Sequence, residues 1–282
     1  MLDMFRNPKL AAAVYASQKT PRSPSDIVLE VSSGMALGDL PGGAPTACWV
    51  FTNAESVRLY RGNDYIAAFS PDRHGRFAAM PHPPIEINDF VGSLLEKYEG
   101  MDPPSAQAAA AILNDMRRCA MELSPLSKAR MLSLRLSWNE VARMYCKYIG
   151  ILGSPSPVYR FEAVWHGRVV GTVVREPVQS VRLECTVHNP ILTDGPTWDC
   201  AAVSLRAIDQ NGNLLPYCGE AVQLRVDGPL KIIGPSVVPL RGGMAGTYLA
   251  TTGEAGRAVL HCRMEGALDT DAVLTIRCRE NG

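Results

Sequence analysis

Alternation of apolar and polar residues predicts β-strands in two separate stretches of the first 176 residues. Residues 56–60 alternate strictly, and the turn at residues 61–64 leads back into an antiparallel partner. Residues 158–165 also alternate, and the turn around Gly167 returns the chain along a second hairpin. The strands predicted in this part of the chain are residues 27–32, 47–52, 56–60, 65–69, 158–165 and 169–174.

The residues between these two stretches follow a helical pattern. Residues 106–122 are rich in Ala, Leu, Met and Arg, and Ser105 is expected to be the N-cap of this helix. A second helix is expected to follow Ser124, because a proline suited to the first turn comes next. Ser137 and Glu140 have the Ser-x-x-Glu spacing of a capping box, which predicts a third helix.

The two β stretches are each too short to form a stable sandwich alone. We therefore expect one β-sandwich domain over residues 21–176 with a helical insertion at about 86–150, and a second all-β domain over residues 177–282. The strands expected in the second domain lie near residues 180–187, 199–208, 220–227, 230–233, 245–251, 256–264 and 271–279. About seven short strands in ~100 residues is typical of an immunoglobulin-like sandwich. The predicted fold class is mainly β, with two immunoglobulin-like β-sandwich domains, the first carrying an α-helical insertion.

The first residues of the chain have a different pattern. Residues 1–19 are expected to form a short helical end, which the Thr20-Pro21 pair stops. Its apolar side chains are those of Met4, Phe5, Leu10, Val14 and Tyr15. A helix this short cannot bury such a face by itself, so we expect this end to pack against a partner.

Charge and cysteine content narrow the class of protein. The 282 residues include 28 Lys+Arg and 28 Asp+Glu, so the net charge is zero and the surplus of cations that a nucleic-acid binder needs is missing. No apolar stretch is long enough for a membrane span, and Asp3 and Arg6 interrupt any signal peptide. The eight cysteines are expected to be buried free thiols in a reducing cytoplasm. A disulfide set and a zinc site are the less favoured alternatives.

No motif in the sequence predicts an active site, a metal or a cofactor. The glycine-rich turns lack the Lys-Ser/Thr of a phosphate-binding loop, and there is no Gly-x-Ser-x-Gly elbow. One loop could in principle surround a cation but is better explained as a polar connection; its candidate ligands are Asp72, His74, His82, Glu86 and Asp89. Glu140 follows an asparagine, as the acid/base of many glycosidases does, but the capping box explains it better.

Aromatic side chains can stack on sugars, and the four tryptophans are the candidates. Trp49 and Trp165 lie within alternating strands and are expected in the core. Trp198 follows Gly-Pro-Thr in a turn, so it is the tryptophan expected to be exposed and the one candidate for a sugar contact.

Five runs, in order along the chain, resemble glycoside hydrolase family 2, the β-galactosidase type. The first resembles the exit of that family's catalytic barrel, the second a strand of the sandwich after the barrel, and the other three the next immunoglobulin-like domain. These runs are residues 2–9 with 12–15, residues 51–60, residues 207–216, residues 234–243 and residues 252–256. The resemblance implies that residues 1–20 are a remnant of the end of the barrel.

The resemblance also implies what the chain lacks. In that family both catalytic glutamates lie in the barrel, and no position here matches either motif, so no catalytic residue is carried over. We therefore expect a non-catalytic, post-barrel portion that braces a barrel and shapes the substrate entrance or an oligomer contact. The barrel-interface candidates are Met4, Phe5, Arg6, Val14 and Tyr15.

Two alternatives stay open at the level of sequence. One is a free-standing carbohydrate-binding or adhesive pair of sandwiches, and the other is a small subunit that complements a separate barrel chain. The expected partner is a catalytic barrel in the same or a separate chain, with a homo-oligomer as a further option and neither nucleic acid nor membrane. The role of the helical insertion is not indicated by any motif.

Overall fold

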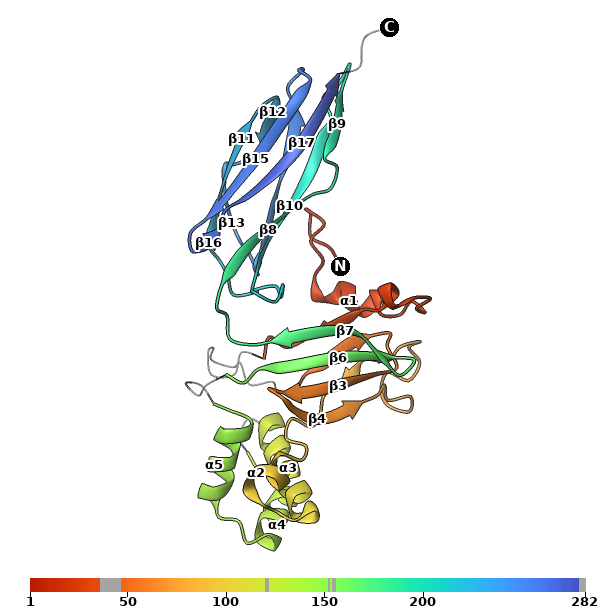
Figure 1. Cartoon of the computed structure of the whole chain (residues 1–282), viewed down its shortest axis with the longest axis vertical. Coiled ribbons are helices and arrows are strands. Elements are labelled where there is room, and N and C mark those ends of the chain that lie inside the picture. Colours follow the sequence, from red (N-terminus) through yellow and green to blue (C-terminus); the bar gives the residue numbers. More distant parts are fainter. Residues whose placement is uncertain (36–46, 120–121, 152, 154–155, 279–282) are drawn as a thin grey trace. The chain divides into compact units, whose positions relative to one another are not determined.

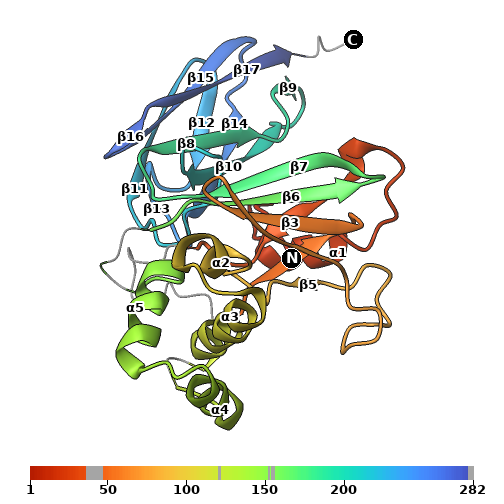
Figure 2. The same cartoon turned by 60° about the horizontal axis from the view of Figure 1, so that its bottom comes forward.

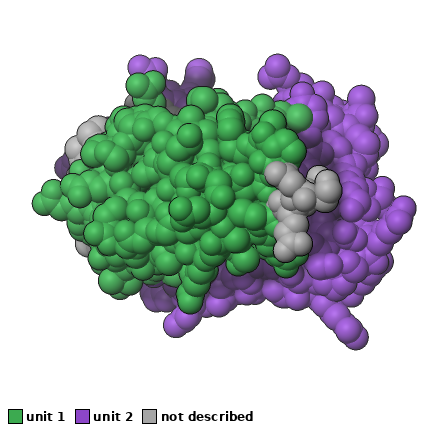
Figure 3. Space-filling model, turned by 90° about the horizontal axis from the view of Figure 1, so that it is seen from above, with its two compact units in different colours: residues 1–9, 178–282 green, residues 10–177 purple. Residues whose placement is uncertain are grey.

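The computed structural model of the chain describes residues 1–35, 47–119, 122–151, 153 and 156–278. It divides into two compact units (Figures 1 and 3), one of residues Leu10–Pro177 and one of residues Met1–Lys9 with Val178–Gly282. The change of unit after Pro177 lies where the sequence predicts the second domain to begin. The first nine residues belong with the C-terminal unit, so the segment predicted as one helical end is shared between the two.

The unit of residues 10–177 contains two antiparallel sheets. Their strands are β1 (Leu29–Val31), β2 (Trp49–Thr52), β3 (Ser56–Arg61), β4 (Asp64–Phe69), β5 (Ile85–Glu86), β6 (Tyr159–Trp165) and β7 (Arg168–Arg175). One sheet has the order β1-β2-β5 and the other β4-β3-β6-β7. Strand β3 pairs with β6, with Leu59 opposite Phe161, so the two β stretches that are far apart in sequence share one sheet. This pairing confirms the mainly β fold predicted for this part of the chain.

This unit has two short helical elements before β1 and a group of helices between β5 and β6. They are α1 (Leu10–Ala16), the 3-10 turn η1 (Pro24–Asp26), α2 (Leu94–Glu99), α3 (Pro103–Arg118), α4 (Pro125–Ser133) and α5 (Trp138–Tyr148). Figures 1 and 2 show α2 to α5 grouped together beside the sheets. No helix in the described ranges is long and apolar enough to cross a membrane.

The helix boundaries partly correct the prediction. Ser105 is not the N-cap of α3: the carboxylate of Asp102 accepts the Ser105 backbone N–H at 3.2 Å, and Pro103 and Pro104 occupy the first turn. Proline is tolerated there because these N–H groups have no partner within the helix. The helix also ends at Arg118 rather than at residue 122. The caps predicted at Ser124 and Ser137 are confirmed.

The helical end predicted over residues 1–19 is wrong in extent. Only Leu10–Ala16 is helical, and residues 1–9 form a looped segment closed by backbone hydrogen bonds between Met1 and Lys9 and between Asp3 and Asn7. A positive φ of 67° at Arg6 breaks any helix there.

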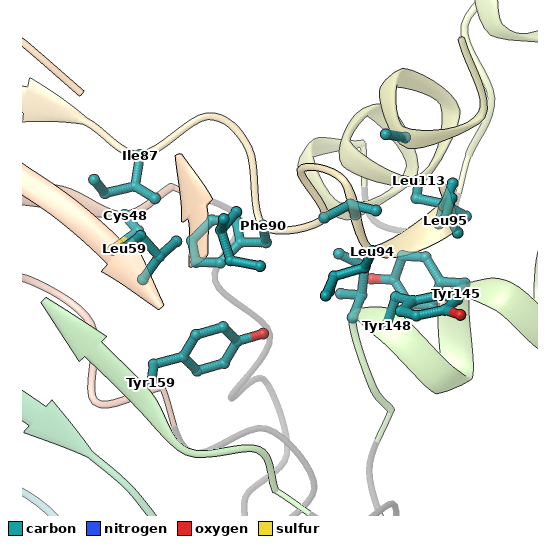
Figure 4. Close-up of a cluster of buried hydrophobic side chains, with 14 of the residues drawn as sticks. Cys48, Leu59, Ile87, Phe90, Leu94, Leu95, Leu113, Tyr145, Tyr148 and Tyr159 are labelled. Carbon is teal, nitrogen blue, oxygen red and sulfur yellow. The ribbon is translucent and has the colours of Figure 1, made fainter. Parts of the chain in front are cut away.

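One apolar core joins the sheets to the helices of this unit (Figure 4). It includes residues of both sheets, such as Val50 and Leu59, and residues of α2 and α5, such as Leu94 and Tyr148. Phe90 connects the two parts, with its ring 5.7 Å from that of Tyr159 in an edge-on arrangement. The helical segment is therefore part of the domain core and not an appended surface element.

The C-terminal unit is all β. Its strands are β8 (Val181–Val187), β9 (Ile191–Asp194), β10 (Cys200–Ile208), β11 (Ala221–Asp227), β12 (Leu230–Ile233), β13 (Val237–Pro239), β14 (Met244–Thr251), β15 (Gly256–Met264), β16 (Ala267–Leu268) and β17 (Thr270–Cys278). They form two five-stranded sheets, β12-β14-β10-β8-β16 and β13-β11-β15-β17-β9. All seven predicted strands are present. The three short strands β9, β13 and β16 were missed because each is too short to show alternation.

A second apolar core lies within this unit and draws on both of its sheets. It includes Val203, Leu205 and Leu249 from one sheet and Leu260 and Leu274 from the other. The five residues are fully buried, as expected for the inward positions of a two-layer fold. The immunoglobulin-like connectivity of this unit stays a prediction.

Candidate functional site

The looped segment of residues 1–9, here called the N-terminal loop, is held in shape by one aspartate. The carboxylate of Asp3 accepts the backbone N–H groups of Phe5 and Asn7, each at 2.8 Å, and the side-chain amide of Asn7 at 2.9 Å. A short acidic side chain that bonds to backbone two and four residues later is the usual means of fixing such a turn. In the run that resembles the barrel exit, residues 2–9 therefore form a hydrogen-bonded turn, whereas residues 12–15 lie in α1.

The N-terminal loop is bound to β10 and β14 by side-chain hydrogen bonds to its backbone. The carbonyl oxygen of Phe5 accepts the Ser204 hydroxyl at 2.5 Å and lies 3.2 Å from Nε2 of His188. The Tyr248 hydroxyl donates to the carbonyl oxygen of Met4 at 2.8 Å. In return, the Asn7 amide donates to the carbonyl oxygen of Ala245 at 2.9 Å.

A glycine in β14 makes room for this contact. The Phe5 ring packs 5.5 Å from the Tyr248 ring, directly over Gly246. A Cβ atom added to Gly246 would overlap the Phe5 side chain and would lie 2.5 Å from the carbonyl oxygen of Val203. Glycine is therefore required here for the close approach of the loop to the strand.

Beside the N-terminal loop lies an apolar groove of about 590 Å³. Met4 and Phe5 line one side of it, and its other apolar walls come from strands and turns of the C-terminal unit. Those walls include Ile233, Pro235, Val238, Pro239, Met244 and Tyr248. Such a groove can hold an apolar side chain of a partner. Its charged lining residues are Asp3, Lys9 and Arg241, and the Asp3 carboxylate is already bonded to the backbone of the loop.

The structure places the five barrel-interface candidates on both units. Met4, Phe5 and Arg6 belong to the C-terminal unit, whereas Val14 and Tyr15 lie on α1 in the other. Met4 is 72% exposed and Tyr15 is 66% exposed. Phe5 and Val14 are half-buried, and the Phe5 ring packs against the Tyr248 ring of this same chain. Sequence reasoning had no means of finding that internal contact.

The carboxylates weighed as catalytic candidates have structural partners. Glu140 accepts the backbone N–H of Ser137 at 2.7 Å and completes the predicted capping box, and these hydrogen bonds hold the pKa of Glu140 below its usual value. Glu99 accepts from Arg143, Lys147 and Tyr148, which lower its pKa to about 2. A general acid needs a raised pKa, whereas the surroundings of Glu140 and Glu99 lower theirs.

The loop weighed as a cation site does not assemble a ligand set. Asp72 accepts the backbone N–H of His74, the backbone of His82 exchanges hydrogen bonds with the Gln18 side chain, and Asp89 caps the turn at Val91. In the part of the chain that the structure describes, no three His, Cys, Asp or Glu side chains meet in a metal-binding arrangement.

A cavity of about 770 Å³ opens between the loop before α2 and the helices α3 and α4. Asn114 lies at its floor, 8% exposed, and bonds to the Asp89 carboxylate and to the Ala110 carbonyl through its amide. Its side-chain oxygen accepts the Phe90 backbone N–H at 3.1 Å. The bonds to Asp89 and Phe90 fix the loop before α2, and the bond to Ala110 stays within α3, so the residue has a structural role.

The exposure of the tryptophan side chains agrees with the prediction at Trp198 but not at Trp49 and Trp165. Trp198 is 58% exposed, as expected for a turn residue. Trp49 and Trp165 are half-buried rather than core residues, which corrects the prediction. Trp49 meets the Phe77 ring edge-on at 5.7 Å, because strand β2 leaves one face open to the loop that follows β4.

The cysteines also depart from the prediction. All eight are free thiols, but Cys48 and Cys262 alone are buried, while Cys119, Cys146, Cys200 and Cys278 are exposed. The exposed cysteines lie at helix ends or on the outward side of strands, where local sequence does not reveal the direction of the side chain.

Comparisons with curated proteins identify the relatives of this fold. The chain is 25% identical over 262 residues to a β-galactosidase of Thermoanaerobacter pseudethanolicus and 28% identical over 264 residues to one of Rhizobium meliloti. Both matches cover 93% of this chain. It resembles a part of the β-galactosidases. The chain spans only 28% and 27% of the length of these two relatives. No family model matches it.

Solved structures show the same fold within larger enzymes. A β-glycosidase from Bacteroides vulgatus matches 97% of the chain with a TM-score of 0.57, at 12% identity and over 27% of its own length. A β-glucuronidase of glycoside hydrolase family 2 matches 98% with a TM-score of 0.54, at 12% identity and over 22% of its length. The resemblance to the C-terminal, post-barrel region of a family 2 enzyme is confirmed by these findings.

Proposed function

We propose that this chain is a non-catalytic accessory portion of a β-galactosidase-like glycoside hydrolase, and that it braces the catalytic barrel. The observation that carries the proposal is the N-terminal loop. Its backbone is fixed to β10 and β14 by hydrogen bonds, yet the Met4 side chain that it carries is 72% exposed. A segment that is hydrogen-bonded in place and holds an apolar side chain in solvent is typical of a surface that a partner covers.

Two further observations support the proposal. Met1 and Leu2 of the same loop are 62% and 54% exposed, and Leu10 and Tyr15 of α1 are 46% and 66% exposed. The chain also matches about a quarter of the length of its relatives, which leaves room for a barrel in the whole enzyme. Each unit thus exposes apolar side chains that a partner can cover.

The test begins with the genomic DNA around the coding sequence, which identifies the barrel-coding region, whether in frame or in a separate gene. The 282-residue chain and that barrel are then expressed separately and mixed. We expect no hydrolysis of an aryl β-galactoside by the chain alone, and an increase of at least about tenfold in the barrel's activity on mixing. Hydrolysis by the chain alone would overturn the proposal.

A pair of variants tests the surface itself. Met4→Ser removes the exposed side chain without touching the hydrogen bonds that its backbone makes, so we expect weaker binding to the barrel by about tenfold. Tyr217→Ser is the matched control, because Tyr217 is 79% exposed in the same unit but lies outside the loop and its groove. Equal affinity of both variants for the barrel would contradict the assignment of the surface.

Exposure of Trp198 favours a second candidate, a carbohydrate-binding module. Its ring is 58% exposed in a turn between β9 and β10, which suits stacking on a sugar. If this function holds, the isolated chain is retained on a column of immobilised galactan, and Trp198→Ala abolishes the retention. The accessory function predicts no retention of either protein.

A further inference from the structure

Two cysteines of the C-terminal unit meet across its two sheets. Cys185 lies on β8 in one sheet and Cys262 lies on β15 in the other, and their sulfur atoms are 3.9 Å apart. Strands β8 and β15 approach until some of their Cα atoms are within 8 Å of one another. Among the eight cysteines, all of which lie in described parts of the chain, no other pair has its sulfur atoms in contact.

Each cysteine is held within its own sheet by strand pairing. Cys185 is opposite Leu205 of β10, and Cys262 is opposite Leu224 of β11 and Thr270 of β17. A disulfide needs a sulfur–sulfur distance of about 2.05 Å and Cα atoms about 4.4–6.8 Å apart. The sulfur atoms therefore have to approach by roughly 1.9 Å for the bond to form.

We propose that Cys185 and Cys262 are a reversible inter-sheet disulfide site, which closes when the chain meets an oxidising small-molecule disulfide such as oxidised glutathione. In the first step the Cys185 thiolate attacks one sulfur of that disulfide, a mixed disulfide forms, and one small thiolate leaves. In the second step the Cys262 sulfur attacks the Cys185 sulfur and displaces the other small thiolate, which takes up the proton that Cys262 releases. The protein loses two hydrogens, and the small disulfide is reduced to two thiols.

The surroundings of the two thiols set this order. The Cys262 thiol donates to Cys185, which lowers the pKa of Cys185 below that of an ordinary cysteine. The same shared proton, together with burial, raises the pKa of Cys262. Cys185 is also half-buried, whereas Cys262 is fully buried, so an external disulfide reaches Cys185 first.

The bond would link strands that are far apart in sequence. Residues 185 and 262 are separated by 77 positions, a span that runs from β8 to β15. A cross-link over so long a loop restricts the unfolded chain strongly. We therefore expect oxidation to raise the unfolding midpoint of the C-terminal unit by more than about 5 °C.

The experiment uses the folded 282-residue protein in buffers of oxidised or reduced glutathione, with circular dichroism to verify that it stays folded. Samples are quenched in acid. They are then unfolded in denaturant at neutral pH in the presence of N-ethylmaleimide, which labels the thiols that are still free. The protein is digested, and the peptides are analysed by mass spectrometry. We expect a peptide pair joined through Cys185 and Cys262, two hydrogens lighter than the separate peptides and released by reductant. The joined pair is expected to be absent from Cys185→Ser and Cys262→Ala and retained in Cys200→Ser, which removes an exposed cysteine.

Three results would each overturn the proposal. One is that glutathione is found attached to the exposed cysteines, while Cys185 and Cys262 both carry the maleimide label and were therefore still free thiols. Another is a joined peptide that forms only in denaturant. The third is a joined peptide in the folded protein without any rise in the unfolding midpoint relative to Cys185→Ser in the same buffer.

Discussion

Replacement of Asn53 by alanine tests how the sandwich of residues 10–177 is held together. Asn53 directly follows β2 and is 3% exposed. Its side-chain oxygen accepts the backbone N–H of Val28 at 2.8 Å, and its amide donates to the carbonyl oxygens of Lys19 at 2.9 Å and Asp26 at 3.0 Å. One side chain thus ties the segment before β1 to the end of β2.

The expected cost follows from these three bonds. Asn53→Ala leaves one backbone donor and two backbone acceptors without their partner, at about 1 kcal/mol each when water can partly replace the lost bond. Lys19 is exposed and Asp26 is half-buried, so this lower value applies. We expect a loss of about 3 kcal/mol in the free energy of unfolding. With an m-value of about 2 kcal/mol/M, the urea midpoint falls by about 1.5 M.

The assay is urea unfolding followed by tryptophan fluorescence in a Trp198→Phe background. Trp49, Trp138 and Trp165 then report on the unit of residues 10–177 alone, because Trp198 is the one tryptophan of the C-terminal unit. Asn63→Ala, in the exposed turn between β3 and β4, is the matched control and should change stability by less than about 0.5 kcal/mol. A loss below about 1 kcal/mol for Asn53→Ala would refute the reasoning.

The isosteric change Asn53→Asp adds a pH signature. A carboxylate still accepts from Val28 but faces the carbonyl oxygens of Lys19 and Asp26 without a proton to donate. Burial and these oxygens raise the pKa of the new carboxyl group in the folded state. The variant should therefore approach wild-type stability at low pH, where the group is protonated, and lose stability as the pH rises through the folded-state pKa. If the loss in free energy of unfolding caused by Asn53→Asp did not change with pH, this account would be contradicted.

Two further predictions concern the N-terminal loop and the helices. Gly246→Ala should push Phe5 off β14 and make the loop at least about fivefold more sensitive to trypsin at Arg6 and Lys9. Gly219→Ala is the control and should leave the digestion rate unchanged, because a Cβ added there meets nothing within 4 Å. Glu99→Gln should make the free energy of unfolding depend less on pH in the acid range. Because the pKa of Glu99 is held at about 2, the wild type keeps the stabilising contribution of this carboxylate above about pH 4.5 and loses it as the pH falls towards 2. Urea unfolding from pH 2 to 6 measures this, and equal slopes for both proteins would contradict it.

Local sequence was sufficient wherever a few neighbouring residues decide the structure. The alternation at residues 56–60 and the capping box at Ser137 each specify an element through contacts within a few positions, and both were predicted correctly. The start of α3 was misplaced because Asp102 and Ser105 are both good caps, and the two prolines between them fit the first turn as well as a preceding loop.

Contacts between distant residues could not be predicted in this way. Phe5 was expected on a partner because nothing in residues 1–19 indicates that Gly246 provides a place for its ring. The Cys185–Cys262 contact has the same origin, since alternation assigns each cysteine to a strand but does not say which strands of opposite sheets meet. Met4 and Tyr15, in contrast, were recognised as apolar side chains that a short segment cannot bury, and both are exposed.

Several carboxylates of the chain are held in the ionised form by neighbouring hydrogen-bond donors. Seven Asp and Glu side chains have a pKa below the usual value, and each of them accepts hydrogen bonds at a cap, a turn or an ion pair. These groups are Asp26, Asp64, Glu99, Asp102, Asp115, Glu140 and Asp271. A glycosidase needs one carboxyl group whose environment raises its pKa so that it can protonate the leaving group. The environments found here do the opposite and stabilise the ionised form, which is how carboxylates contribute to a scaffold. The proposed bracing of a barrel rests instead on the N-terminal loop, whose backbone is hydrogen-bonded to β10 and β14 and whose Met4 side chain is exposed.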